Sequence, residues 1–164
     1  MSAAASLLVI WHSHTGATQA MAQAIAEAAS AAVSVRCLPA QHAHAADVLA
    51  ASAVVFATPE TLGSMSGGLK DFFDRSYYAL LDRCVGKACA LVVCAGSDGA
   101  PTIAQLQRIT TGLRLRQVAD PLRVCTHAQT AQAIAAPKQL DAQALRAARE
   151  LGTLLGEGLA MGVF

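Results

Sequence analysis

The sequence predicts an α/β protein built as a three-layer, doubly wound, five-stranded parallel sheet. Short apolar runs alternate with helix-like segments about five times along the 164 residues. Three of these runs are continuously apolar, which is typical of strands buried on both faces. Such strands need helices on both sides of the sheet, and parallel strands need helical crossovers between them. For a chain of this length, the strand order 2-1-3-4-5 is a natural choice.

Strands are expected in the segments that contain few polar residues. The clearest are residues 7–11, 33–35, 53–57 and 89–94. A weaker strand lies within residues 113–125, where Asp120-Pro121 interrupts it. Because proline cannot donate to a central ladder, we place this fifth strand at an edge of the sheet.

Helices are expected between these strands, because apolar residues recur there at helical spacing. An Ala-rich segment, residues 17–29, carries Met21 and Ile25, and a second helix follows the histidines near residue 44. A stripe over residues 69–81 predicts another helix with Phe72 and Phe73 in the core. Residues 103–113 form a further helix, with Pro101 near its first turn. The last helix covers residues 140–159, and its inward residues are expected to be Leu151, Leu154 and Leu155.

Length and composition predict a single domain over residues 1–164 and a small-molecule partner. Lys and Arg number 12 against 11 acidic residues, and a net charge of +1 creates no field that would recruit nucleic acid or an anionic membrane. The apolar N-terminal run lacks a basic start, since the first cation is Arg36, so we interpret it as a buried strand and not a signal peptide. The five cysteines have neither redox-pair nor zinc spacing, which favours reduced thiols and a cytoplasmic location.

Ligands of doubly wound sheets bind beyond the carboxyl ends of the strands, near the point where the strand order reverses. Three loops meet there, residues 11–18, 58–66 and 95–102. The first opens a helix with Ser13, His14, Thr15, Gly16, Ala17 and Thr18. Free amides, the helix dipole and three hydroxyls would converge at this point, so the loop predicts a phosphate monoester site that needs no lysine or arginine. The alternative is that the hydroxyls simply cap the helix.

The S-x-T-G-x-T pattern of this loop resembles the phosphate-binding loop of the flavodoxin family, whose cofactor is flavin mononucleotide (FMN). The resemblance implies a flavodoxin-like strand order. Other phosphate motifs do not fit, because no G-x-G-x-x-G follows the first strand and Leu69 stands where a P-loop has lysine. A receiver domain would need acidic residues where this chain has Trp11-His12 and Ala57-Thr58.

The second loop and its helix, residues 58–75, resemble the T-P-x-x-x-G-x-M…F-x-D segment of flavodoxin-like NAD(P)H:quinone oxidoreductases. The segment is also similar to NADPH-dependent FMN reductases. The resemblance implies FMN contacts from Thr58, Pro59, Glu60, Thr61, Leu62 and Gly63. Amides of residues 60–63 would face the N5 and O4 edge of the flavin ring. The alternative is a glycine-rich loop that leads into an ordinary helix.

The third loop is small enough for a flat ring to approach its backbone. Ala95, Gly96, Ser97 and Asp98 are the expected contacts with the N1 and O2 edge, where amide donors stabilise reduced flavin. The alternative is a simple glycine-rich connection with Asp98 as a turn residue.

The second and third loops contain no Trp, Tyr or Phe, unlike the aromatic clamps that true flavodoxins use. An exposed ring face favours an FMN oxidoreductase that passes two electrons from NADPH or NADH to a quinone or similar small acceptor. Hydride transfer at N5 requires no catalytic side chain and no metal from the protein. The resemblance also implies a homo-oligomer. A flavin carrier or sensor without turnover remains an alternative.

Two further alternatives come from other residues. Ala95 to Gly99 approximates the G-x-S-x-G elbow of serine hydrolases, with Ser97 as nucleophile and Asp120 and His127 following in the required order. The pairs His12/His14 and His42/His44 could instead ligate a metal ion.

Overall fold

A computed structural model, which describes residues 4–164, confirms the predicted α/β class with a parallel main sheet. The strand order is β2-β1-β3-β5-β6, with β7 also paired to β5, and these pairings are all parallel. Counting β5 as the fourth strand and β6 with β7 as the fifth gives the predicted order 2-1-3-4-5. These strands are β1 (Ser6–Trp11), β2 (Ser34–Pro39), β3 (Ala53–Thr61), β5 (Ala88–Ala95), β6 (Arg116–Gln117) and β7 (Leu122–Cys125).

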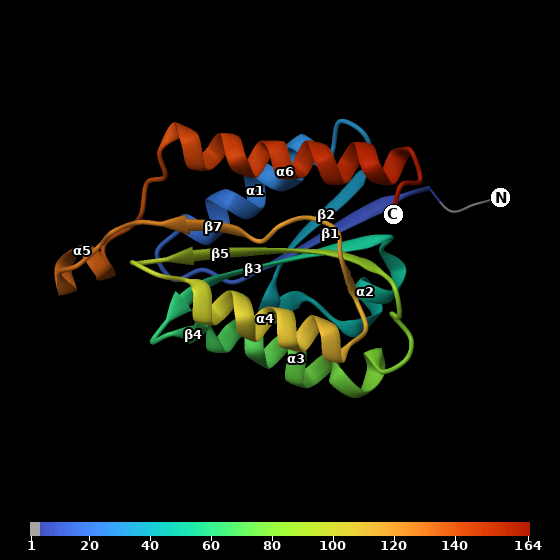
Figure 1. Ribbon diagram of the computed structural model, residues 1–164, viewed down its shortest axis with the longest axis horizontal. Coiled ribbons are helices and arrows are strands. Elements are labelled where there is room, and N and C mark those ends of the chain that lie inside the picture. Colours follow the sequence, from blue (N-terminus) through green and yellow to red (C-terminus); the bar gives the residue numbers. More distant parts are fainter. Residues whose placement is uncertain (1–3) are drawn as a thin grey trace.

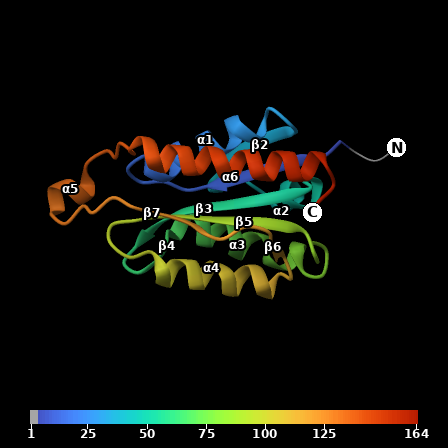
Figure 2. The ribbon, with the colours of Figure 1, turned by 45° about the horizontal axis from the view of Figure 1, so that its top comes forward.

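Helices cover both faces of the sheet (Figures 1 and 2). One face carries α1 (Ala17–Ala29) and α6 (Ala142–Ala160), and the other carries α2 (Ala45–Ala50), α3 (Gly67–Leu80) and α4 (Ala100–Gly112). No helix within residues 4–164 is both long and apolar enough to cross a membrane.

The buried stretches of the central strands are apolar at consecutive positions because each face of the sheet is covered by its own core. Val9, Val55 and Val92 point toward the core beneath α1 and α6. Their neighbours Leu8 and Val54 point toward the core beneath α3 and α4. The alternation of side chains along a strand therefore places consecutive apolar residues in two separate buried layers.

Helices α1 and α6 pack unusually close together because glycine faces α1. A Cβ atom placed on Gly152 would lie 2.3 Å from the carbonyl oxygen of Ile25. Leu151 and Leu155 are buried as expected. The expectation for Leu154 was wrong, since 48% of this residue is exposed: it lies one position away from the buried stripe of α6.

Two strands extend beyond their predicted ends. The edge strand β2 continues to Pro39, where partly exposed polar residues obscure its apolar pattern. Strand β3 passes through Thr58 and Pro59 and ends at Thr61, where it forms a hairpin with β4 (Ser64–Met65). Pro59 is tolerated because it stands near the end of the ladder, opposite Cys94.

The expected fifth strand is split in two. The segments β6 and β7 both pair with β5, and the interruption lies at Asp120-Pro121 as the sequence indicates. Beyond β7 the chain forms a short helix, α5 (Ala131–Ala135), for which the sequence analysis gave no indication. A single turn of 3₁₀ helix, Ala40–His42, follows β2.

Candidate functional site

The three predicted loops meet around one pocket of about 490 Å³ at the carboxyl edge of the sheet. In Figure 1 this is the edge toward which the arrows of β5 and β7 point. The predicted site residues that line the pocket are Ser13, His14, Thr15, Ala17, Thr18, Pro59, Glu60, Thr61, Leu62, Gly63, Ala95, Gly96 and Ser97. The volume is within the range of small-molecule and cofactor sites.

Three predicted residues do not line this pocket. Gly16 belongs to the first loop and adopts a left-handed φ of 97°. A Cβ atom at this position would meet only the carbonyl oxygen of Lys138, at 3.9 Å. The hydroxyl of Thr58 is buried and accepts a hydrogen bond from the Ser66 amide (3.0 Å), so it supports the start of α3. Asp98 is exposed and accepts a hydrogen bond from the Ala100 amide at the start of α4.

The first loop leaves hydrogen-bond donors free at the start of α1. The Gly16 amide donates to Ser13 Oγ (3.0 Å), and the backbone hydrogen bonds of α1 begin with the Ala20 amide, which donates to Gly16 O (3.0 Å). Among the described residues, the amides of Ala17 and Thr18 donate to no protein acceptor. No side chain caps α1, so its positive end faces the pocket uncompensated.

Thr18 has a buried hydroxyl whose Oγ1 has no hydrogen-bond partner. Only 1% of the residue is exposed, and it lies next to the Cys94 thiol. Burial raises the pKa of Cys94 to about 11, although the neighbouring Thr18 hydroxyl acts in the opposite direction, so the thiol is protonated at neutral pH. Leaving a buried hydroxyl unpaired costs about 1 to 3 kcal/mol, so a ligand that accepted a hydrogen bond from it would recover that cost.

The segment after β7 closes one side of the pocket and was missed by the sequence analysis. The Lys138 amide donates to Thr15 O (2.7 Å), which ties this segment to the first loop. The Lys138 ammonium donates to the carbonyl oxygens of Ala133 (2.7 Å), Ile134 (2.8 Å) and Ala136 (2.6 Å), at the end of α5. The lining residues outside the three predicted loops are Thr126, Ala128, Gln129, Ile134 and Lys138, and Cys94 of β5 joins them.

The second loop is a tight hairpin and not the open loop that the sequence suggested. Glu60 pairs with Met65 and Thr61 pairs with Ser64, so Leu62 and Gly63 alone form the turn. Both have positive φ, 53° and 73°, which is the pattern of a type I′ turn. The hairpin forms one wall of the pocket.

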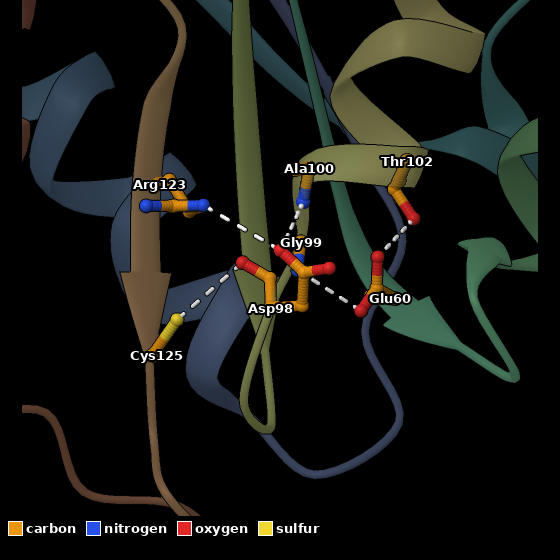
Figure 3. Close-up of polar contacts among 7 residues, drawn as sticks. All are labelled: Glu60, Asp98, Gly99, Ala100, Thr102, Arg123 and Cys125. Atoms are coloured by element: carbon orange, nitrogen blue, oxygen red, sulfur yellow. Dashed lines mark hydrogen bonds and ion pairs between the residues drawn. The ribbon is translucent and has the colours of Figure 1, made fainter.

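Glu60 joins this hairpin to the third loop (Figure 3). Its Oε1 accepts a hydrogen bond from the Gly99 amide (3.0 Å), and its Oε2 accepts one from Thr102 Oγ1 (2.8 Å). The carboxylate therefore caps the start of α4 from another element, where the helix dipole favours a negative charge. Glu60 lines the pocket, but both of its oxygens are engaged within the protein.

The third loop also presents unpaired amides. The carbonyl oxygens of Ala95 and Gly96 accept hydrogen bonds from the Thr126 amide (2.9 Å) and the His127 amide (2.7 Å), which fixes the loop. Among the described residues, the amides of Gly96 and Ser97 donate to no protein acceptor. The loop is thus held in place while its donors remain available to a ligand.

The arrangement does not assemble a serine hydrolase triad. Asp120 precedes β7 and His127 follows it, and the four strand residues between them alone span about 13 Å at about 3.3 Å per residue. Within residues 4–164, no side-chain hydrogen bond joins Ser97 to either residue. The sequence order of the three residues is therefore not matched by their positions in the fold.

The histidine pairs gather no further ligands. His12 and His14 are in edge-to-face contact, with ring centroids 4.7 Å apart. Burial, assisted by the charge of His14, lowers the pKa of His12. In the described part of the chain, no three His, Cys, Asp or Glu side chains are grouped so that they could hold a metal ion.

Structural comparison places this pocket in a well-populated fold. The chain is similar to a flavodoxin from the domain Archaea, with a TM-score of 0.77 and 18% identity over 94% of this chain and 98% of that one. It is similar to a flavodoxin, WrbA-like protein from Agrobacterium tumefaciens, with a TM-score of 0.76 and 20% identity over 96% and 98%. It also resembles the Flv1 flavodiiron core from Synechocystis sp. PCC6803, with a TM-score of 0.77 and 20% identity over 97% of this chain and 37% of that one.

Comparison at the level of sequence gives two results. The search of curated proteins found no match to this sequence. The family model for NADPH-dependent FMN reductase matches residues 39–130, which include the second and third loops of the pocket. This match covers more than half of the 164 residues, and it includes the β3–β4 hairpin and the start of α4. The chain therefore belongs to the NADPH-dependent FMN reductase family.

Proposed function

We propose that this protein is an FMN-dependent oxidoreductase that binds the FMN phosphate at the start of α1. The unpartnered, buried Thr18 Oγ1 carries the proposal, because it lies beside free helix amides in a pocket of suitable size. The amides of Ala17 and Thr18, with the hydroxyls of Ser13 and Thr15, complete a donor set for a dianionic ester. Lys138 and His14 are the basic side chains that line this pocket.

The hairpin and the third loop are the segments that would hold the flavin ring. Pro59, Glu60 and Thr61 form one wall, and Ala95, Gly96 and Ser97 form the other with their free amides. Amide donors near the N1 and O2 edge would favour the reduced, anionic ring. The Glu60 contacts to Gly99 and Thr102 keep the two walls at a fixed separation.

The reaction we propose is two-electron transfer from NADPH or NADH to a quinone or similar small acceptor. FMN supplies the hydride chemistry when bound, and the protein supplies orientation and access. The pocket has no Trp, Tyr or Phe among its lining residues, so a second flat molecule can reach the ring. The Cys94 thiol is protonated and the Glu60 carboxylate is engaged within the protein, which is compatible with a hydride transfer that requires no protein nucleophile.

The test is a titration of the purified apoprotein with FMN, followed anaerobically by NADPH, NADH and a quinone. We expect saturable binding with a shifted flavin absorbance spectrum, bleaching by a nicotinamide donor, and recovery of colour with the quinone. Binding of FMN without bleaching by either donor would instead support an electron carrier. An apoprotein that does not bind FMN would overturn the assignment of the pocket.

A further inference from the structure

The tip of the β3–β4 hairpin carries an unfavourable residue. Leu62 adopts a φ of 53°, a left-handed conformation that is uncommon for a bulky side chain. Its side chain is also fully exposed. Type I′ turns strongly prefer Asn-Gly or Asp-Gly, because asparagine and aspartate tolerate positive φ and are soluble. Leucine is therefore a poor choice both for the turn and for contact with water.

A second exposed aliphatic residue, in α5, borders the same pocket. Ile134 of α5 is 56% exposed, and α5 buries none of its residues. Both Leu62 and Ile134 line the pocket. In Figures 1 and 2, the β4 hairpin and α5 both project beyond the same end of the sheet. The mouth of the pocket thus has apolar side chains, whereas its interior at Thr18 is rich in polar donors.

Neither side chain contributes to the two protein cores. Strained backbone conformations cluster at binding sites and switch regions, so the left-handed Leu62 beside the pocket is a candidate for a binding role. Glu60 ties the hairpin to the start of α4, and the β3–β4 pairing places Leu62 at the turn, so the backbone beneath this side chain is hydrogen-bonded without a ligand. A preorganised apolar contact binds a ligand without further ordering of the chain.

We propose that Leu62 and Ile134 form an apolar contact for a flat, uncharged aromatic acceptor that enters over the bound flavin. This inference rests on the proposed function, and it assigns the acceptor contact to two side chains at the mouth of the pocket. The contact favours apolar ring systems over charged acceptors, because desolvation of a charge between two aliphatic groups is unfavourable. FMN itself is held deeper, by the donors around Thr18.

The test uses equilibrium binding, so that it does not depend on turnover. Oxidised protein saturated with FMN is titrated with tetramethyl-1,4-benzoquinone, a flat apolar probe with no free ring position for thiol addition, and the flavin difference spectrum is recorded. Leu62→Asn and Ile134→Gln are each expected to raise the Kd of the probe about fivefold, from the loss of apolar contact area. Val85→Asn, at another exposed aliphatic residue, is the matched control and should change the Kd by less than about twofold.

Two further measurements separate the outcomes. The Kd of FMN should change less than about threefold in Leu62→Asn, and the thermal midpoint of the apoprotein should stay the same or rise, because asparagine suits the turn. A probe Kd that Leu62→Asn leaves unchanged while FMN still binds overturns the inference. A large loss of FMN affinity in this variant, or a lower thermal midpoint, overturns it as well. Failure of the unaltered apoprotein to bind FMN would instead refute the proposed function.

Discussion

The C-terminal end of helix α1 is tightly packed, whereas its N-terminal end leaves polar groups without partners. Toward its C-terminal end, α1 packs so closely on α6 that Gly152 and Gly156 leave no space for a Cβ atom against Ile25 and Ala29. At its N-terminal end, amides and the Thr18 hydroxyl lack partners within the described chain. The difference shows how one element serves stability and binding at once. The packed end supplies favourable contacts, and these compensate for polar groups left unsatisfied at the pocket.

The largest effect is expected at the packed end. Gly152→Ala should destabilise the protein by about 3 kcal/mol, because the new Cβ atom would lie 2.3 Å from a backbone oxygen of α1 and the helices would have to separate. Urea unfolding of the apoprotein measures this change. Gly112→Ala in α4 is the control: a Cβ atom there meets nothing within 4 Å, so the higher helix propensity of alanine should stabilise the protein by about 0.5 to 1 kcal/mol. Equal effects at the two glycines would contradict the comparison.

A substitution at the other end should separate stability from binding. Thr18→Val keeps the side-chain shape and removes the unpaired hydroxyl, so the apoprotein should be as stable or more stable. FMN binding should weaken by about 1 to 3 kcal/mol, because the phosphate loses a buried donor. Isothermal titration with FMN measures the expected loss of affinity. Urea unfolding measures whether the apoprotein is as stable as the unaltered protein or more stable. Thr110→Val, which removes a buried hydroxyl bonded to Leu106 O (3.0 Å), is the control and should leave FMN affinity unchanged. Unchanged FMN affinity in Thr18→Val would refute the role of this hydroxyl.

The link between the pocket walls should have an intermediate effect. Glu60→Ala removes the acceptor of the Gly99 amide and of Thr102 Oγ1, and should destabilise the start of α4 by about 1 kcal/mol. FMN affinity should fall several-fold, because the hairpin and the third loop are no longer joined. Asp98→Asn, also at this helix start but outside the pocket lining, should reduce stability less and leave FMN affinity unchanged. Equal losses of FMN affinity in both variants would show that Glu60 has no special linking role.

The smallest effect concerns pH. The pKa of His12 is lowered from 6.5 in the folded protein by burial, and by the charge of His14. The unfolded chain therefore binds this proton more readily, and the free energy of unfolding should fall as the pH drops below 6.5. His12→Phe should reduce the difference between urea unfolding at about pH 7.5 and at about pH 5.5. His42→Gln, at an exposed histidine, is the control, and an equal reduction in both variants would exclude His12 as the cause.

The sequence by itself determined the parallel sheet and the first loop of the candidate site. These features depend on local patterns: continuous apolar runs for buried strands, helical spacing for α1, and hydroxyls with glycine at a helix start. The strand order was predicted from the chain length and the family resemblance. The predicted α1 agrees with the observed one at both ends, Ala17 and Ala29. Most residues of the three loops line one pocket because carboxyl ends of parallel strands share an edge.

Tertiary structure decided the features that depend on contacts between distant segments. The hairpin at Leu62-Gly63 arises from pairing beyond the apolar end of β3, and the closure by Lys138 depends on its amide meeting Thr15 from another part of the chain. Glu60 is predicted from the sequence as a loop residue, but its partners are Gly99, just before α4, and Thr102 in its first turn. Local patterns could not reveal these pairings, because their energies come from hydrogen bonds and packing formed only when the chain is folded.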